Sequence, residues 1–371
     1  MERQRIGIIG YIMRLINWIF IIGLLLSYLA QWISPEVFWP ISFFGLAYPI
    51  LIIVNILFLT HWIFRRRKFL IYPLLAIMVG LPMLGRFVQF GSNTEVIDAS
   101  NNLKIITYNV HVLDYYHQHY GGSGYAGDLI LEKMKLENAD IYCMQEFYCK
   151  GDKGKILISK YKEQLNTPYT YHKLYGSKNS NIANVIFSKY PIIRNGIVEN
   201  PKDKYKIPGI FADIELNGSE IRIYSVHLKS IHISGNIDLM NDISNLDTEE
   251  GQQKAKDNSI YFINKFKKAF SERSVQISSL KNHIANSPFP VIIAGDFNDT
   301  PSSYAYSQLR DGLDDAFVKK GGGFGQTYIG PYPSFRIDNI LFDPQFTCTD
   351  YNTIKIKLSD HYPISAEFGI Y

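Results

Sequence analysis

The chain has 371 residues and a formal net charge of +4 at pH 7. A charge this small and diffuse does not favour a nucleic-acid-binding groove. The three cysteines, Cys143, Cys149 and Cys348, match neither a metal-ligand spacing nor an even set of disulfides, and Cys143 is expected to be a small core residue. The composition is uneven: residues 1–92 are overwhelmingly apolar, whereas residues 93–371 resemble a soluble domain with a sizeable core.

Apolar segments in the first part of the chain predict three transmembrane helices, at residues 11–33, 38–64 and 69–90. The first carries one charge, Arg14, and each is long enough to cross a hydrocarbon core of about 30 Å. Pro73 and Pro82 interrupt the third. A cleavable signal peptide explains none of the later segments, and buried helices of a soluble protein are the alternative. We therefore expect a membrane domain over residues 1–92 and a second domain over residues 93–371.

Basic residues predict the orientation in the membrane. They are concentrated before the first segment and between the second and third, at Arg3, Arg5, Arg14, Arg65, Arg66, Arg67 and Lys68. The loop near residues 33–38 has no Lys or Arg. Because basic loops stay in the cytoplasm, three spans place the second domain on the extracytoplasmic side of the cell membrane, in a multi-pass protein. If the third segment lay only at the interface, the domain would be cytoplasmic.

The second domain shows apolar strands interspersed with helical patterns. Strands are expected at residues 103–110, 139–146, 184–192 (ending in a turn), 211–216, 221–228, 290–294, 335–342 and 354–358. Helices are expected at residues 128–138, about 254–285, and near 302–310. The first two strands and the helix between them form a βαβ-like or layered pattern. Asn217-Gly218 predicts a hairpin turn.

Two polar segments, residues 111–127 and the stretch that starts at residue 231, are expected to be loops. The first contains His111, His117 and His119, which could suggest a metal site. Their spacing fits no helix face, so a solvated or substrate-lining loop is the favoured interpretation.

Polar side chains able to do chemistry follow six of the predicted strands. Asp296 and Asn298 come after a buried strand and Gly295, and residues two apart on an extended backbone point to the same face. A local Asx turn is the alternative there. The other candidates are Asn109, Glu146, His227, Asp338, and Asp360 with His361. Any one of them alone would commonly be a surface or packing residue, but together they favour a site.

This set of side chains suits phosphoester hydrolysis. Glu146 and Asp360 offer hard carboxylate oxygens, which suit Mg²⁺ or Mn²⁺ better than zinc, and such a metal polarises a phosphoryl oxygen. His361, next to carboxylates, is a candidate base for activating water. The sequence has no G-x-S-x-G elbow and no G-x-x-x-x-G-K-[ST] loop. Covalent acyl chemistry and nucleoside triphosphate hydrolysis are therefore disfavoured.

The motifs TYNV, QE, VHL, GDFN, RIDNILF and SDHYPI occur in this order between residues 103 and 368. This arrangement resembles the endonuclease/exonuclease/phosphatase superfamily, the group of deoxyribonuclease I, apurinic endonucleases, neutral sphingomyelinases and inositol polyphosphate 5-phosphatases. GDFN and SDH are the most specific motifs. The resemblance implies an α/β (α+β) fold, a four-layer α/β/β/α sandwich of two packed sheets, here preceded by three transmembrane helices.

The resemblance also implies a metal site and a water-activating group. Glu146 matches the metal-binding glutamate, Asn109 a metal-site amide that orients the phosphate, and Asp360 a second metal-side carboxylate. Asp296 matches the group that positions or deprotonates the attacking water, and Asn298 the amide that holds the phosphate.

The histidines match further functional positions. His361 matches the histidine that contacts the scissile phosphate, and Asp338 the carboxylate that orients it; whether Asp296 or His361 is the base stays open. His227 matches the additional histidine of the deoxyribonuclease and sphingomyelinase types. In deoxyribonuclease I a glutamate supports that histidine, and no equivalent of it is assigned between residues 169 and 190.

The favoured function is a membrane-anchored, Mg²⁺- or Mn²⁺-dependent phosphodiesterase or phosphatase that uses metal-assisted, in-line attack by water. Tethering raises the local concentration of lipids, so a phospholipid or sphingolipid headgroup, or a small phosphoester, is the expected substrate. An extracytoplasmic DNA or RNA nuclease is the alternative, but basic residues such as Lys202, Lys204 and Lys206 are scattered. A non-catalytic receptor would show damage among the candidate residues, and none is visible. The oligomeric state is not predicted.

Overall fold

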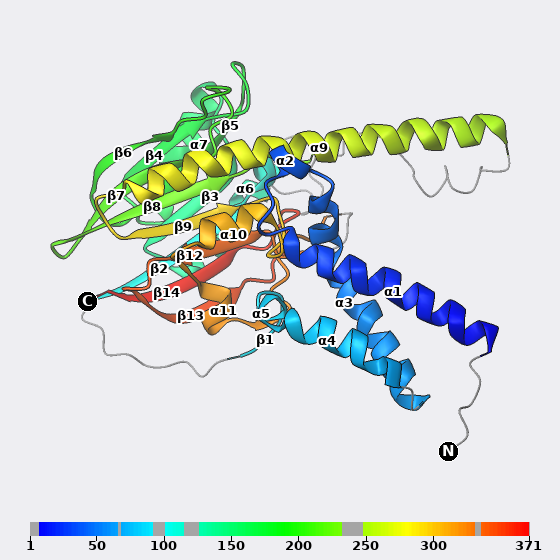
Figure 1. Cartoon of the computed structure of the whole chain (residues 1–371). Helices are drawn as coiled ribbons and strands as arrows, with labels where there is room; N and C mark the ends of the chain where they lie inside the picture. The colour runs from blue at the N-terminus through cyan, green and yellow to red at the C-terminus, as the bar shows by residue number, and fades with distance from the viewer. Residues whose placement is uncertain are drawn as a thin grey trace.

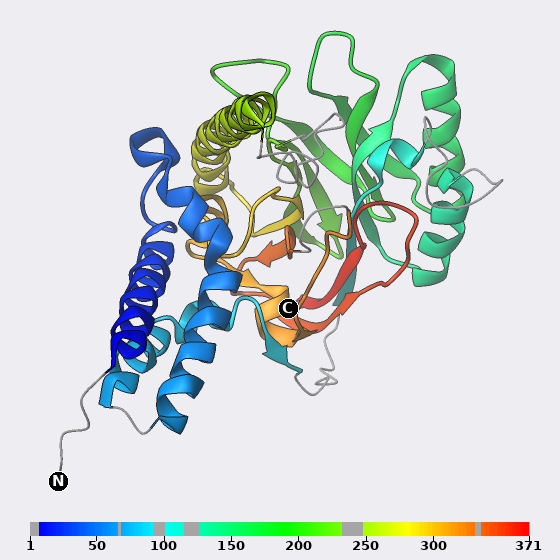
Figure 2. The same cartoon turned by 90° about the vertical axis from the view of Figure 1, so that its right-hand side faces the viewer.

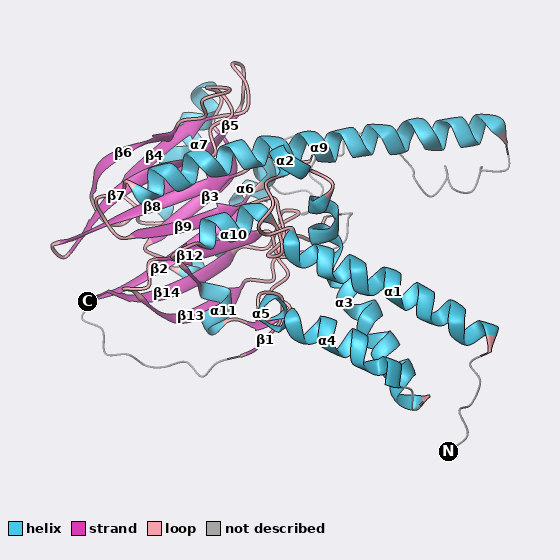
Figure 3. Ribbon diagram, in the orientation of Figure 1, coloured by secondary structure: helices cyan, strands magenta, loops and turns pink. Residues whose placement is uncertain are grey.

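The computed structural model describes residues 7–65, 68–91, 101–114, 126–231, 248–330 and 335–370. Two six-stranded sheets pack face to face, and helices cover their outer faces (Figures 1 and 3). The predicted four-layer α/β/β/α sandwich is therefore confirmed.

The first sheet has the strand order β13-β14-β2-β3-β5-β4. Its strands are β13 (Thr347–Thr353), β14 (Ile364–Ile370), β2 (Asn101–Asn109), β3 (Ile141–Tyr148), β5 (Ile182–Ser188) and β4 (Tyr169–Leu174). Its outer face is covered by α6 (Ala126–Glu137) and α7 (Gly151–Gln164). β2 and β3 are parallel and α6 lies between them in sequence, as the βαβ-like pattern predicts.

The second sheet has the strand order β10-β12-β9-β8-β7-β6. Its strands are β10 (Asp314–Asp315), β12 (Asp338–Phe342), β9 (Val291–Asp296), β8 (Ser219–His227), β7 (Gly209–Leu216) and β6 (Ile192–Val198). The adjacent helices are α9 (Glu249–Ala285), α10 (Tyr304–Arg310) and α11 (Ala316–Lys320). Asn217 and Gly218 have φ values of 50° and 89°, which confirms the hairpin turn between β7 and β8.

Apolar side chains of the two inner faces form the central core. Cys143 and Ile105 come from the first sheet, and Ile223 and Ile292 from the second; all four are buried. This confirms Cys143 as a core residue. The strands β2, β3, β8 and β9 are buried over most of their length, and β9 accordingly begins with a continuous apolar run, residues 291–294.

The expected strand at residues 354–358 is wrong. The strand of this region is β13, which ends at Thr353, and β14 follows from Ile364. The alternating residues Ile354, Ile356 and Leu358 pack against the apolar cluster beneath α6 without a strand partner. The alternation of apolar and polar residues here therefore arises because one side of the segment is buried, and not because the segment pairs in a sheet. The long helix α9 begins earlier than expected, at Glu249, and residues 232–247 lie outside the described residues.

Among the described residues, two long apolar helices, and not three, precede the sandwich. They are α1 (Ile8–Leu29) and α3 (Ile41–Phe64), separated by the short α2 (Pro35–Phe38). The expected third span is divided into η1 (Lys68–Leu70), α4 (Ile71–Val79) and α5 (Leu81–Leu84). α4 rises only about 14 Å, less than the thickness of a hydrocarbon core.

The break in the third segment occurs at Gly80. A Cβ atom there would overlap the hydroxyl of Tyr28, which donates to the carbonyl of Ala76 at 3.0 Å. Pro82 then lies in the first turn of α5, where its missing N–H is tolerated. Close packing against α1, together with this proline, therefore ends one helix and starts another. The division of the chain at residues 92 and 93 stays a prediction.

Some polar side chains inside the helical part form hydrogen bonds between the helices. Trp62 Nε1 donates to Asn17 Oδ1 at 2.8 Å, and Asn55 Nδ2 donates to the carbonyls of Phe20 and Leu51 at 3.0 and 2.8 Å. In an apolar environment such bonds favour association of helices. They link α1 to α3 in the described structure.

The helical part contacts the sandwich beside α9 and α10 (Figure 2). Ser302 Oγ donates to the carbonyl of Gly45 at 2.7 Å, and the ring of Phe43 packs edge-on against Phe270 at 5.5 Å. In addition, β1 (Gln89–Phe90) pairs with β11 (Gly322–Gly323). The connection between α1 and α3 and the end of the helical part therefore both touch the sandwich.

The ion pair of Arg336 and Asp315 should contribute strongly to stability. Arg336 donates to both carboxylate oxygens at 3.2 and 2.8 Å, and both side chains are buried. We expect Arg336→Met to lower the free energy of unfolding by about 3–5 kcal/mol, because Asp315 is left as an uncompensated buried charge. Urea unfolding of the full chain in detergent measures this loss.

Lys281→Met is the matched control. Lys281 pairs with Asp311 at the surface, where an ion pair contributes about 0–1 kcal/mol. Equal losses for the two variants would contradict the structural role of the buried pair.

Candidate active site

The predicted site residues meet at one end of the sandwich. Asn109, Glu146, His227 and Asp296 lie at or near the carboxyl ends of β2, β3, β8 and β9, which reach the same edge (Figure 1). Asp338 begins β12, which is antiparallel to β9 and opposite Asp296 in register. The two sheets therefore contribute to one site, as expected from the positions of these residues at strand ends.

Asp296 lies at the centre and accepts hydrogen bonds from both sides. Asn109 Nδ2 donates to Asp296 Oδ2 at 3.0 Å across the two sheets. Asn298 donates its backbone N–H to Oδ1 at 2.8 Å and its side-chain amide to Oδ2 at 3.0 Å. The local Asx turn considered as an alternative is thus present, and the same residues also belong to the site.

Backbone geometry at two positions places these groups. A Cβ atom at Gly295 would overlap the backbone of Val226, so glycine permits the close approach of β9 to β8 just before Asp296. Glu146 has a φ of 53° and lies at an irregularity in the pairing of β3 with β5. Such bulges redirect side chains next to active sites.

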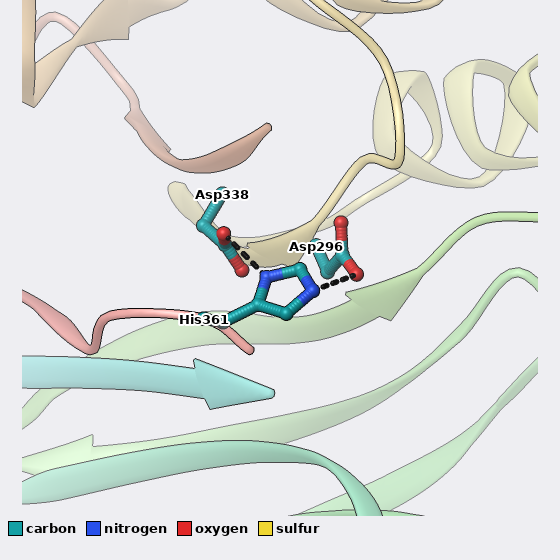
Figure 4. A group of neighbouring side chains, drawn as sticks. All are labelled: Asp296, Asp338 and His361. Atoms are coloured by element: carbon teal, nitrogen blue, oxygen red, sulfur yellow. Dashed lines mark hydrogen bonds and ion pairs between the residues drawn. The ribbon is translucent and has the colours of Figure 1, made fainter. Parts of the chain in front are cut away.

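His361 lies between two carboxylates (Figure 4). Its Nδ1 is 2.9 Å from Asp338 Oδ2, and its Nε2 is 3.8 Å from Asp296 Oδ2. Burial opposes the charged imidazolium, but Asp338 and Asp296 outweigh it and raise the pKa of His361 to about 10. Burial raises the pKa of Asp296 to about 7, against the lowering effect of His361. His361 is therefore the charged, proton-donating group at neutral pH.

Asp360 lies at the rim of this group. Its Oδ1 is 4.0 Å from His361 Nε2 and 3.2 Å from Ser359 Oγ. Asp360, the residue before His361, therefore also has its carboxylate near the imidazole of His361.

Asp296, Asp338 and His361 have ligand atoms within 4.8 Å of one another, a spacing that a metal ion could bridge. A protonated imidazole has no free lone pair, however, and Nδ1 is engaged with Asp338. Glu146 fits a hard cation better, because its carboxylate offers oxygen ligands and is not paired with a protonated histidine as closely as Asp338 is. Glu146, Asn109 and Asp360 stay the predicted metal ligands, and in the described structure Asn109 turns its amide nitrogen towards Glu146 while its Oδ1 accepts the N–H of His111.

His227 reaches the same group from β8. Its Nε2 is 3.5 Å from Glu146 Oε1 and 3.6 Å from Asp296 Oδ2. On the other side of the ring, Tyr175 Oη is 2.5 Å from His227 Nδ1. His227 therefore belongs to the site, next to the group expected to hold the metal.

Three supporting residues were not predicted from the sequence: Tyr175, Thr327 and Ser359. Thr327 Oγ1 accepts the backbone N–H of Asp338 at 3.1 Å, and Ser359 Oγ donates to the carbonyl of Asn109 at 2.8 Å. Ser359 precedes the predicted pair Asp360-His361, and that adjacency is the one sequence feature that could have pointed to it. Tyr175 and Thr327 have no comparable local feature. Of the loop histidines, His111 is described, and His117 and His119 lie outside the described residues.

The charge of His361 should depend on Asp338. Asp338 has the largest effect among the carboxylates that raise the His361 pKa, so Asp338→Asn should lower that pKa from about 10. Titration of the histidine signals by NMR, on the full chain without added metal, measures the change. Asp311→Asn, an exposed carboxylate far from the site, should leave the pKa unchanged. An unaltered His361 pKa in Asp338→Asn would contradict the assigned interaction.

Comparison with known proteins supports the fold. D. rerio TDP2 complexed with a single-strand DNA product superimposes with a TM-score of 0.51 at 17% sequence identity, over 73% of this chain and 100% of that chain. An endonuclease/exonuclease/phosphatase family protein from Leptotrichia buccalis C-1013-b gives a TM-score of 0.50 at 16% identity, over 72% and 100% of the two chains. At these identities the similarity establishes the fold alone.

Sequence comparison adds the family. No functionally curated protein matches the chain. Residues 10–87 match a family described as a domain of unknown function, DUF8431. Residues 106–361, more than half of the chain, match the model of the endonuclease/exonuclease/phosphatase family, and this match contains every residue of the site described above. The chain therefore belongs to the endonuclease/exonuclease/phosphatase family of phosphoester hydrolases.

Proposed function

We propose that the chain is a membrane-anchored, Mg²⁺- or Mn²⁺-dependent phosphoester hydrolase that acts on the headgroup of a membrane lipid. The observation that carries this proposal is the position of the apolar helices. α1, α3 and α4 project from the end of the sandwich at which β2, β8 and β9 deliver their polar residues (Figures 1 and 2). A bilayer around these helices would face the site.

The site residues can divide the work of hydrolysis between a base and donors. Asp296 is the group able to accept a proton from water, because Asp338 keeps His361 protonated. His361 and the amide of Asn298 are donors that can bind phosphate oxygens and stabilise charge that develops on them. A divalent cation held by Glu146 would supply polarisation of the phosphoryl oxygen and offset charge on the leaving group.

The exposure of the helices supports a membrane environment. Only 22% of the most apolar stretch of α1 and 39% of that of α3 are buried. A core helix of a soluble protein would be mostly buried, whereas Ile9, Leu15, Ile19 and Leu57 are each more than half exposed. Contiguous apolar surface on this scale requires a partner or a lipid phase.

The course of the chain through α1 and α3 supports the proposed orientation. The connection between α1 and α3 contacts α9, through Ser34 and Ser274, whose hydroxyls are 2.9 Å apart. α3 then leads away from the sandwich to Arg65, and residues 68–90 return to it, where β1 pairs with β11 (Figure 1). Arg65 and Lys68 therefore lie at the far end of the helical part, which by the positive-inside rule favours an extracytoplasmic catalytic domain.

The helical part also contacts the loop that follows Asp296 and Asn298. Ser302 Oγ donates to the carbonyl of Gly45 at 2.7 Å, and Arg86 Nη1 donates to the carbonyl of Pro301 at 3.2 Å. These contacts connect the membrane part directly to the strand exit that presents Asp296. They support a fixed orientation of the site relative to the bilayer.

A nucleic-acid substrate is less well supported by the charges. Lys202 pairs with Glu36 at 2.8 Å, and Lys206 pairs with Glu272 and Asp203 at 3.3 and 3.5 Å. Lysines that are already paired contribute little to binding of a phosphate backbone. DNA therefore enters the assay below as the competing substrate.

Activity should require both the metal and the site. The full chain in detergent, with Mg²⁺, should hydrolyse bis-p-nitrophenyl phosphate or a lipid phosphoester, and chelation by EDTA should abolish this activity. His361→Ala should lower kcat by about 10²–10⁴-fold, because it removes a proton-donating group, and Glu146→Ala should remove the metal dependence together with the activity. Glu163→Ala, an exposed carboxylate on α7, is the control. Activity that survives either site substitution would overturn the assignment, and preference for DNA over lipids would support the nuclease alternative.

Membrane presentation should decide which lipid molecules are cleaved. With the full chain in vesicles, a lipid phosphoester in the same vesicle should be hydrolysed, and the same lipid in separate protein-free vesicles should not. Bis-p-nitrophenyl phosphate in solution, the control, should be hydrolysed in both cases. Equal hydrolysis of the two lipid pools would contradict a site that faces its own bilayer. A reporter fused after residue 371 and found in the cytoplasm would contradict the proposed extracytoplasmic orientation.

A further inference from the structure

Tyr175 connects the residue expected to hold the metal with a histidine of the site. It follows β4 and is buried, and its hydroxyl makes two contacts within the described residues. Glu146 donates its backbone N–H to Tyr175 Oη at 3.2 Å, and His227 Nδ1 lies 2.5 Å from the same oxygen. The ring of Tyr175 also packs edge-on against the imidazole, with centroids 5.3 Å apart.

The hydroxyl has one hydrogen to donate, and the contacts decide its direction. The lone pairs of Oη accept the N–H of Glu146, so within the described part of the chain His227 Nδ1 is the acceptor left for the hydroxyl hydrogen. A phenol with an ordinary pKa of about 10 keeps this hydrogen at neutral pH. Nδ1 of neutral His227 is therefore the unprotonated nitrogen.

We propose that Tyr175 is a positioning residue that sets the tautomer of His227, so that its Nε2 carries the hydrogen and donates into the site. The opposite side of the ring agrees with this assignment independently. Nε2 is 3.5 Å from Glu146 Oε1 and 3.6 Å from Asp296 Oδ2, and two carboxylates favour a nitrogen that carries a hydrogen.

The tautomer determines what His227 can do in the proposed hydrolysis, on which this role rests. A hydrogen on Nε2 makes His227 a donor to a phosphate oxygen bound near Glu146, and it cannot take a proton from water through that nitrogen. A carboxylate in place of the phenol would accept a hydrogen from Nδ1 and would leave Nε2 as an acceptor. Tyrosine at position 175 thus makes His227 a hydrogen-bond donor that can stabilise negative charge on a bound phosphate.

Tyr175 also holds the backbone of Glu146. Glu146 has a φ of 53°, which is unfavourable for a residue with a side chain, and its N–H is buried at the bulge of β3. The hydroxyl satisfies this N–H, so loss of the hydroxyl leaves a buried donor without its partner. The same oxygen therefore supports Glu146 and orients His227.

Nitrogen NMR of the full chain in detergent tests the tautomer without substrate or metal. The imidazole ¹⁵N shifts of His227, assigned by their disappearance in His227→Asn, should show a protonated Nε2 and an unprotonated Nδ1 at a pH where the ring is neutral. In Tyr175→Phe the two tautomers should become mixed. Tyr169→Phe, an exposed tyrosine on the neighbouring β4 strand, should leave the pattern unchanged.

Kinetics provide the second measurement. Tyr175→Phe should lower kcat by about 10–100-fold with little change in KM, the usual effect of removing a group that orients a residue beside a metal, and Tyr169→Phe should not. A wild-type His227 protonated at Nδ1, or an unchanged tautomer in Tyr175→Phe, would overturn the proposal even if the enzyme is active. If Tyr175→Phe fails to fold, the wild-type spectrum alone decides. An inactive chain with the expected tautomer would instead count against the proposed function.

Discussion

The carboxylate of Asp296 is buried, and the structure must stabilise its charge. This group is fully buried, and an isolated charge in that position would be strongly unfavourable. Two amides and an imidazolium offset this cost: Asn109 from the first sheet, Asn298 from the turn after β9, and His361 from the chain that leads into β14. The donors come from segments far apart in the sequence, so the site exists only when both sheets are packed together.

This arrangement also separates the chemical roles of similar groups. Asp338 lies close to Nδ1 of His361 and keeps the ring charged. Asp296 faces Nε2 at a longer distance, and burial raises the pKa of Asp296 to about 7. The two aspartates therefore differ in function because of their partners and their burial. The pairing of β9 with β12 places them opposite each other in register.

The apolar helical part makes direct hydrogen bonds to the loop that follows the site residue Asn298. The loop after Asn298 is held by Gly45 and Arg86 through hydrogen bonds to Ser302 and Pro301. A tether that joined the sandwich only through a flexible linker would leave the site free to turn. Here the proposed membrane part and the strand exit of β9 share contacts, which hold the helical part in one position relative to the site.

We could predict from the sequence the alternation of buried strands and helices, the hairpin at Asn217-Gly218, and the identity of the chemical side chains at the strand ends, because each depends on residues close together in the chain. Tertiary structure alone decided which of these side chains meet, that His361 lies between Asp296 and Asp338, and that Tyr175 supports His227. It also decided the break of the third apolar segment at Gly80 and the absence of a strand at residues 354–358. The physical reason is the same in each case: the partner that determines the conformation or the charge, such as Tyr28 for Gly80, is distant in sequence and becomes a neighbour only after the layers have packed.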